Sequence, residues 1–160
     1  MQRGDQLLKQ GAGSAPALAD RDRRLTYAEL DAQVSAVAGA LAARLPEGER
    51  VAVWLPKTIE CVILLFAILR AGLVMVPVNP VLRGQQVRHI LADSGARILI
   101  THRARAAGLA DPPCPLLLLE TDWAALAAYQ DHPDHRRVGA ALVAAAEDGI
   151  DGILVFDLAC

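Results

Sequence analysis

The feature that most constrains the fold is an alternation of short apolar runs with helix-like segments between residues 50 and 119. Runs such as Arg50–Leu55 and Val74–Val78 are almost wholly apolar, which is typical of strands buried on both faces. The alternation predicts an α/β fold, a largely parallel sheet flanked by helices. Strands are expected at 50–55, 74–78, 97–101 and 115–119, and helices at 26–45, 58–70, 85–94 and within 103–110.

Several of the expected helix ends carry recognisable signals. In the string Thr26-Tyr27-Ala28-Glu29, the Thr26 hydroxyl can accept from the Glu29 N–H while the Glu29 side chain reaches back, as in a capping box. Gly72 suits the residue just after a helix end. One apolar stripe follows the capping box at helical spacing: Leu30, Val34, Val37, Leu41 and Leu45.

The regions on either side of the alternation are less regular. Residues 16–27 predict two short strands joined by a solvated charged turn at Asp20–Arg24. Beyond Asp122 the pattern weakens, although Trp123–Tyr129 is helix-compatible. Further along we expect a polar loop at 132–137, a helix-prone segment at 138–146 and a strand at 153–156.

Composition excludes several classes of function. Sixteen basic and 18 acidic residues leave a net charge of −2, so nucleic acid and anionic membranes are not expected partners. The apolar stretch Cys61–Val78 has only nine residues before Arg70, against the roughly 20 that span a bilayer. The three cysteines show no metal spacing, and Met1–Gln10 shows no secretory signal. The chain is therefore expected in the reducing cytoplasm.

The histidines offer only weak candidates for chemistry. His132 and His135 lie beside Asp131 and Asp134, but Pro133 between them favours a solvated loop over a metal site. The pattern indicates a partly buried histidine with satisfied hydrogen bonds at 89. His102 follows an expected strand, where sites of α/β proteins often lie, yet no second group accompanies it in the sequence.

The other reactive residue types support no site either. Cys61 lies in an apolar helix, Cys114 lies in a proline-rich loop, and no feature lowers either thiol's pKa. Lys57 in a strand-to-helix turn is interpreted as a surface residue. The sequence contains no GxGxxG, phosphate-binding P-loop or GxSxG motif. We therefore assign no catalytic, cofactor-binding or metal-ligating residue.

Four sequence pieces nevertheless resemble, in order and spacing, the start of the AMP-forming acyl-CoA synthetases of the adenylate-forming superfamily. The resemblance covers about residues 14–125, and the sequences at 77–80 and 86–91 are similar to those of ligases associated with the exosortase A system. The pieces are LTYAEL at 25–30, RVAVWLPK at 50–57, AILRAG through VPVNP at 67–80, and HILADSGARILIT at 89–101.

The resemblance implies a two-step reaction for the whole enzyme. A carboxylate attacks the α-phosphate of ATP to give an acyl adenylate, and a thiol, usually that of coenzyme A, displaces AMP. The family uses ATP, Mg²⁺, a Thr/Ser/Gly-rich loop ending in Pro-Lys, and a lysine on a C-terminal domain. Lys57 follows a proline without such a loop, and Lys9, the other lysine, lies outside the resemblance.

These observations lead to two main expectations. The first is a truncated N-terminal scaffold portion of such a ligase, inactive alone, with residues 1–13 as lead-in, 14–125 as partial domain and 126–160 as divergent tail. The second is a non-enzymatic α/β module that binds a partner, or one half of a split ligase completed by the missing C-terminal part. A small nucleotide-binding protein is a third, weaker reading, because the loops after the strands are poor in glycine.

Overall fold

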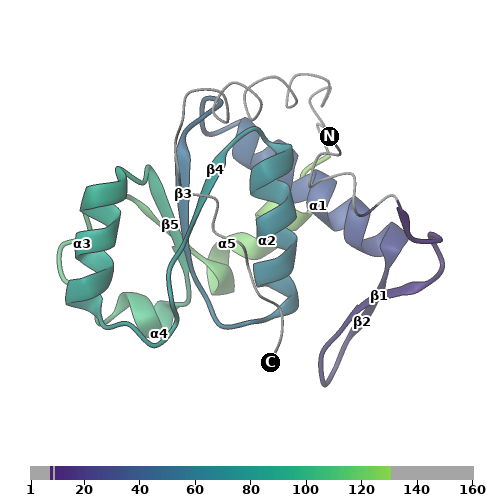
Figure 1. Ribbon diagram of the computed structural model, residues 1–160, viewed down its shortest axis with the longest axis horizontal. Coiled ribbons are helices and arrows are strands. Elements are labelled where there is room, and N and C mark those ends of the chain that lie inside the picture. Colours follow the sequence, from purple (N-terminus) through teal and green to yellow (C-terminus); the bar gives the residue numbers. More distant parts are fainter. Residues whose placement is uncertain (1–7, 9, 131–160) are drawn as a thin grey trace.

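A four-stranded parallel sheet forms the centre of the molecule, with helices on both of its faces (Figure 1). The computed structural model describes residue 8 and residues 10–130. The strand order is β4-β3-β5-β6. The α/β prediction is therefore confirmed. The strands are β3 (Arg50–Trp54), β4 (Val74–Pro77), β5 (Ile98–Thr101) and β6 (Leu116–Leu118), and the helices between them are α2 (Ile59–Arg70), α3 (Gly84–Ser94) and α4 (Arg103–Ala106).

An antiparallel hairpin and a long helix precede this sheet. The hairpin consists of β1 (Pro16–Ala19) and β2 (Arg24–Thr26), as expected, and α1 (Tyr27–Ala42) follows directly. The predicted capping box is present: Glu29 N–H donates to Thr26 Oγ1 at 3.3 Å, and Thr26 N–H donates to Glu29 Oε2 at 2.8 Å. These reciprocal bonds satisfy backbone donors that a helix start leaves open.

Two helix boundaries differ from the sequence-based expectation. α1 ends at Ala42, short of Leu45. α5 (Leu119–Ala127) begins directly after β6, four residues before Trp123. Asp122 explains the early start, because its carboxylate accepts the backbone N–H of Leu118, the last residue of β6, at 2.8 Å. This local hydrogen bond turns the chain from strand to helix, and the spacing of apolar residues does not predict it.

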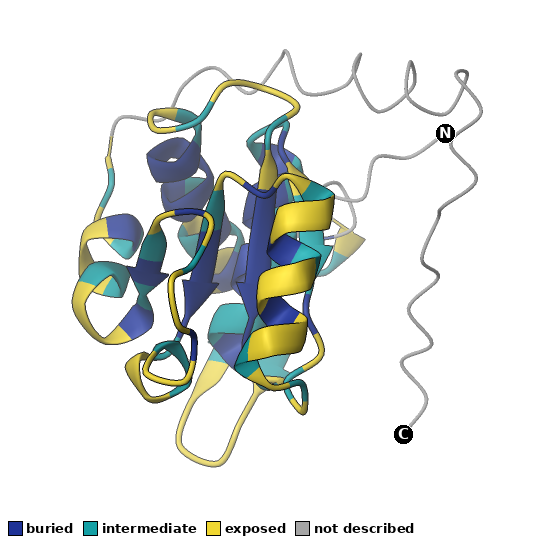
Figure 2. Cartoon of the chain, turned by 90° about the vertical axis from the view of Figure 1, so that its left-hand side faces the viewer, coloured by how far each residue is buried: buried dark blue, intermediate teal, exposed yellow. Residues whose placement is uncertain are grey.

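Alternate residues of the strands supply two separate cores on the two faces of the sheet. Figure 2 shows the central strands coloured as buried between the helices. We call the face covered by α1, α2 and α5 the larger core, to which Val51 and Val53 of β3 point. The face covered by α3 and the segment after α4 is the smaller core, to which Ala52 and Trp54 point. The continuously apolar β3 is thus buried on both sides, as its sequence predicts.

A buried arginine fixes α1 against α2 beneath the larger core. The side chain of Arg70 is only 4% exposed, and it donates to Asp31 Oδ1 at 2.6 Å and to Ser35 Oγ at 2.7 Å. It also donates to the backbone oxygen of Asp31 at 3.2 Å. Because all these partners lie on one turn of α1, the arginine sets how the two helices pack.

The apolar stretch Cys61–Val78 divides into most of α2, a turn and β4. The turn uses Gly72 at a φ of +72°, in the left-handed region expected at a helix end. In the part of the chain that the structure describes, no helix has the length and apolar character needed to cross a membrane.

Candidate functional site

The carboxyl ends of the parallel strands form the edge at which ligands of open α/β sheets usually bind. The strand register places Trp54 of β3 beside Thr101 of β5, and Thr101 beside Leu118 of β6. The segments that leave these strands therefore meet at one edge of the sheet. Thr101 joins two of them, because its buried hydroxyl donates to the Trp54 backbone oxygen at 2.9 Å.

The turn after β3 leads into the start of α2. Lys57 is exposed in this turn, which agrees with its interpretation as a surface residue. Thr58 caps α2 by accepting the Cys61 N–H at 3.4 Å. The lysine and the helix start place positive charge at this corner, but no glycine-rich loop accompanies them, so the cradle that phosphate sites use is missing from residues 55–58.

A histidine–carboxylate pair lies at the neighbouring corner. His102 Nδ1 is 3.1 Å from Glu120 Oε1, and Glu120 also accepts the Arg103 N–H at 3.0 Å and 3.1 Å through its two oxygens. The pKa of the Glu120 carboxyl is held below its usual value, first by the backbone N–H of Glu120 itself and then by that of Arg103. The sequence did not reveal this pair, because its members lie 18 positions apart with a strand between them.

The opposite side of the same edge carries an arginine stacked on a tryptophan. The Arg105 guanidinium lies 5.4 Å from the centre of the Trp54 ring and donates to the Pro80 backbone oxygen. The two contacts hold the loop after β4 against the smaller core. Nearby, a Cβ added to Gly84 would lie 2.0 Å from the backbone oxygen of Gly108. The backbone at the start of α3 therefore packs directly against the backbone after α4, and only glycine fits at position 84.

The charged turn of the hairpin makes a contact that sequence reasoning missed. Asp20 accepts the backbone N–H groups of Asp22 and Arg23, which lower its pKa, and the turn is exposed as expected. Arg23, however, also pairs with Glu60 in the first turn of α2. Burial opposes ionisation of Glu60, but this partner and neighbouring donors together keep its pKa below the usual value.

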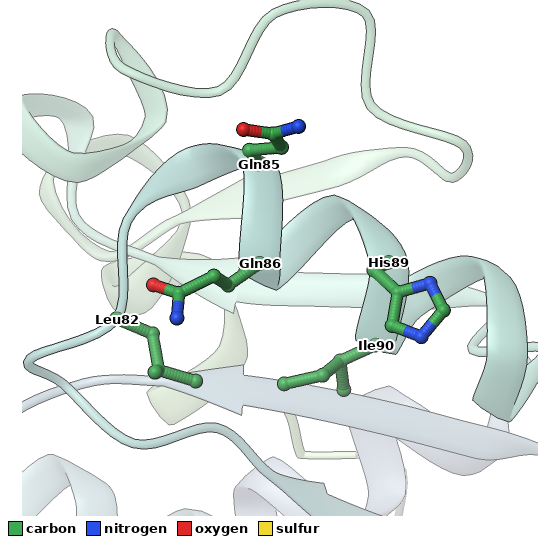
Figure 3. Close-up of a pocket in the computed structure, with 5 residues that line it drawn as sticks. All are labelled: Leu82, Gln85, Gln86, His89 and Ile90. Atoms are coloured by element: carbon green, nitrogen blue, oxygen red, sulfur yellow. The ribbon is translucent and has the colours of Figure 1, made fainter.

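The interpretation of His89 as a partly buried side chain was wrong, because His89 is exposed. It lies on the outer face of α3, while Val87 and Leu91 of the same helix are buried against the sheet. Figure 3 shows it at one end of a shallow surface pocket of about 470 Å³. Its lining contains no aspartate, glutamate, lysine or arginine; it consists of Leu82, Gln85, Gln86, His89 and Ile90.

The remaining candidates that the structure describes form no reactive centre. Burial raises the pKa of the thiols of both Cys61 and Cys114, which disfavours the nucleophilic thiolate, as expected of structural cysteines. Within residues 8 and 10–130, no group of three or more histidine, cysteine, aspartate or glutamate side chains is placed to hold a metal ion. His132 and His135 lie outside the described residues.

The polar contacts described at this sheet edge are therefore scaffold contacts, in which a side chain joins one element to another. His102–Glu120 links the start of α4 to α5, Arg23–Glu60 links the hairpin to α2, and Arg105 links the segments after β4 and β5. A pair such as His102–Glu120 can transfer protons in general, and here Glu120 also binds the backbone at the start of α4.

Curated relatives are similar to this chain over most of its length. The chain is 38% identical over 116 residues to the phosphinothricin tripeptide synthetase PhsC of Streptomyces viridochromogenes, covering 72% of this chain and 11% of that protein. It is 33% identical over 129 residues to the long-chain-fatty-acid–CoA ligase FadD13 of Mycobacterium tuberculosis, covering 73% and 25%. The chain thus spans a quarter or less of the length of these relatives.

A solved structure agrees with this likeness. The N-terminal domain of FACL13 from Mycobacterium tuberculosis superposes with a TM-score of 0.75 and 28% identity, covering 84% of this chain and 38% of that one. The family model described as AMP-binding enzyme matches residues 7–148. With most of its length matched, and with its parallel sheet found again in that N-terminal domain, the chain belongs to the AMP-binding enzyme family.

Proposed function

We propose that this chain is the N-terminal scaffold portion of an AMP-forming acid–thiol ligase and is inactive alone. The reaction of the whole enzyme would join a carboxylate to ATP as an acyl adenylate and then transfer the acyl group to a thiol such as coenzyme A. We assign residues 14–125 to the partial catalytic domain, 1–13 to a lead-in and 126–160 to a divergent tail. The reducing cytoplasm suits its cysteines.

One observation carries this proposal: the described sheet and helices correspond to 38% of the FACL13 N-terminal domain. This chain's share consists of buried strands and helices whose polar side chains bind one another, as the pairs His102–Glu120 and Arg23–Glu60 do. Such residues position neighbouring parts of a domain. The groups that stabilise charge on a triphosphate must then come from elsewhere in the enzyme.

The lysines of the chain support the proposed inactivity. Phosphoryl chemistry of this kind needs cations and backbone donors gathered around the phosphates. Lys57 stands exposed in a turn of residues Pro56–Thr58 that contains no glycine. No Gly/Ser/Thr-rich loop ending in Pro-Lys occurs anywhere in the sequence.

The test is an adenylation assay on the purified chain. With ATP, Mg²⁺ and separate panels of fatty acids and amino acids, we expect no carboxylate-dependent exchange of pyrophosphate into ATP. FadD13 serves as the positive control. Exchange above background by the 160-residue chain would overturn the proposed inactivity, and the class of acid that supports it would then identify the substrate.

A second candidate is a non-enzymatic α/β module that binds a partner, or half of a split ligase. The apolar character of α2 favours it, because every residue between Glu60 and Arg70 is apolar. A chain that is monomeric and unfolds cooperatively by itself would support an independent module. A chain that becomes soluble only when coexpressed with a C-terminal ligase segment would support the scaffold or split-ligase reading.

A further inference from the structure

The two ends of α3 carry charges that oppose the dipole of the helix. Backbone dipoles favour acidic side chains at the start of a helix and basic side chains at its end. The helices α1, α2 and α5 follow this rule with acidic residues in their first turns. In α3 the order is reversed, because Arg83 is the N-cap residue and Asp93 lies in the last turn. A charge pattern that the helix itself disfavours indicates a compensating contact elsewhere.

That contact does not lie within the part of the chain that the structure describes. Arg83 and Asp93 are both exposed, and neither forms an ion pair with a described residue. The remaining charged residue of α3, Arg88, is already engaged, since its guanidinium lies 3.6 Å from Asp111 Oδ2. Arg83 and Asp93 are separated by about 15 Å along the helix. A matching surface therefore has an acidic and a basic group at this separation, in the opposite order.

The surface beside these charges is uncharged and partly apolar. Val81, in the turn before α3, is 81% exposed. Next to it in the chain, Leu82 points toward Ile90 across the shallow pocket (Figure 3), whose other lining residues are two glutamines and His89. Depletion of charged residues is characteristic of the central part of protein interfaces. The outer face of α3 thus combines an uncharged middle with one charge at each end.

The turn that presents Val81 is held in one conformation. Asn79 accepts the Val81 N–H through Oδ1 at 3.0 Å and the Leu82 N–H through its backbone oxygen at 3.1 Å. Arg105 donates to the backbone oxygen of Pro80 in the same turn. Because the turn is ordered before binding, contacts made by Val81 cost little conformational entropy. A rigid turn with an apolar tip is therefore well suited to contact another protein surface.

A second copy of this chain supplies the matching charges. We propose that the outer face of α3 is the interface of a symmetric dimer, in which the two α3 helices pack antiparallel. Positions 83 and 93 are symmetric about position 88, so a two-fold axis there places each Arg83 beside the partner's Asp93. Near the axis the facing side chains are Gln86, His89 and Ile90, which bring no aspartate, glutamate, lysine or arginine into opposition.

The exposed valine fits the two ends of this interface. Positions 81 and 95 are also symmetric about position 88, so each Val81 approaches the partner's Gly95. Gly95 is exposed and follows α3 at a φ of +63°, so no side chain obstructs the valine there. A contact of one helix pair is small, and we therefore expect a weak dimer that dissociates at micromolar concentrations. The dimer does not depend on the proposed function, because it uses only the solvent-facing side of α3.

Sedimentation equilibrium of the purified 160-residue chain, over a range of micromolar concentrations, tests the dimer. We expect Arg83→Glu to raise the dissociation constant about tenfold, because both pairs of opposite charge become pairs of like charge. Asp93→Arg should have the same effect, and the double variant Arg83→Glu with Asp93→Arg should restore association. The matched control is Arg21→Glu, which makes the same change in net charge in the exposed turn of the hairpin, far from α3 (Figure 1).

The same variants separate loss of the dimer from loss of folding. Arg83→Glu and Asp93→Arg each give α3 the end charge that its dipole prefers, so the urea midpoint of the dilute, monomeric chain should not fall. Val81→Ser should also weaken association, whereas Val74→Ser, at the exposed start of β4, should not.

Three results would overturn the dimer: a parent chain that stays monomeric, open-ended aggregates in place of a closed dimer, or association that Arg83→Glu leaves unchanged. A double variant that fails to recover association would overturn the antiparallel pairing. None of these measurements involves adenylation, so their failure leaves the proposed function standing, and pyrophosphate exchange by the chain would leave the dimer standing.

Discussion

The two faces of the sheet are covered by helices of opposite character. On one face, α2 has apolar residues all round, and α1 packs along it through the buried Arg70. On the other face, α3 buries only Val87 and Leu91 and exposes Gln85, Arg88, His89 and Asp93. An amphipathic helix such as α3 can end a protein in water, while an all-apolar helix such as α2 cannot. α3 is therefore a solvent-facing layer, whereas every residue of α2 is buried or only partly exposed.

The two faces also differ in how far their buried polar groups are hydrogen-bonded. Arg70 under the larger core has several donors bound to α1. Among the described residues of the smaller core, the indole N–H of Trp54 has no hydrogen-bond partner although it is buried. Buried polar groups are stabilising only when they are satisfied. The larger core should accordingly be the more rigid of the two.

The largest expected effect comes from opening matched cavities in the two cores. Leu64 and Leu91 are 0% and 1% exposed, and each becomes alanine in a separate variant. We expect Leu64→Ala to lower the free energy of unfolding by about 4 kcal/mol and Leu91→Ala by about 2.5 kcal/mol. The reason is that α3, with solvent behind it, can move inward to fill its cavity, while α2 is held by α1.

Urea unfolding followed by circular dichroism measures both values. Equal losses, or a greater loss for Leu91→Ala, would show that the two layers are equally constrained and would break the comparison. The slope of each transition should match that of the parent chain, because neither variant changes the surface exposed on unfolding by much.

The next effect concerns the buried arginine of the larger core. Arg70→Met keeps the apolar stem but removes the donors to Asp31 and Ser35, and we expect a loss of about 3 kcal/mol. This is the lower end for a broken buried pair, because Asp31 is 39% exposed and water can hydrate it. Asp31→Asn retains an oxygen acceptor and should cost about 1 kcal/mol. Thermal and urea unfolding of both variants give the comparison; a neutral Arg70→Met would remove the arginine as the element that fixes α1 on α2.

The smallest effect compares how the two helices begin. At α1 the back-reaching side chain is Glu29, and at α3 it is Gln86, whose Oε1 accepts the Arg83 N–H at 3.1 Å. Backbone and side-chain donors of Thr26 lower the Glu29 pKa below its ordinary 4.5. The stabilisation of α1 is therefore complete above that value and is lost as the pH falls through the lowered pKa.

We expect Glu29→Gln to lower the melting temperature by roughly 2–3 °C at pH 7, with the difference shrinking toward pH 3. Gln86→Glu at α3 should create the same pH dependence where the parent has none, because a carboxylate near a helix start is stabilised only when ionised. Melting curves between pH 3 and pH 7 measure both. A Glu29→Gln difference that persists unchanged at pH 3 would contradict the role given to the charge.

Local sequence signals predicted most of the helices and strands but few of the contacts between them. The capping box at Thr26 and the turn at Gly72 were predictable because each depends on residues within one helical turn. The start of α5 was not, because it depends on one side chain, Asp122, bonding back to β6. The exposure of His89 was misjudged because spacing alone did not place it on the outer side of the stripe formed by Val87 and Leu91.

The candidate site followed the same division. The sequence predicted that His102 would leave a strand at the functional edge, and that Lys57 would lie exposed in a turn. It contained no sign that Glu120 would bind His102, or that Arg105 would stack on Trp54. His102 follows β5 and Glu120 follows β6, while Arg105 follows β5 and Trp54 ends β3. The register of the sheet therefore brings the members of each pair together.

By itself, the sequence determined the α/β class, the alternation of strands and helices, and the family resemblance, because these follow from periodic burial and local backbone preferences. Tertiary structure alone decided which helix covers which face, and that Arg70 would be buried on α1. The physical reason is that burial and charge pairing depend on the distance between atoms in space, and parallel strands bring residues far apart in the chain to within one hydrogen bond of each other.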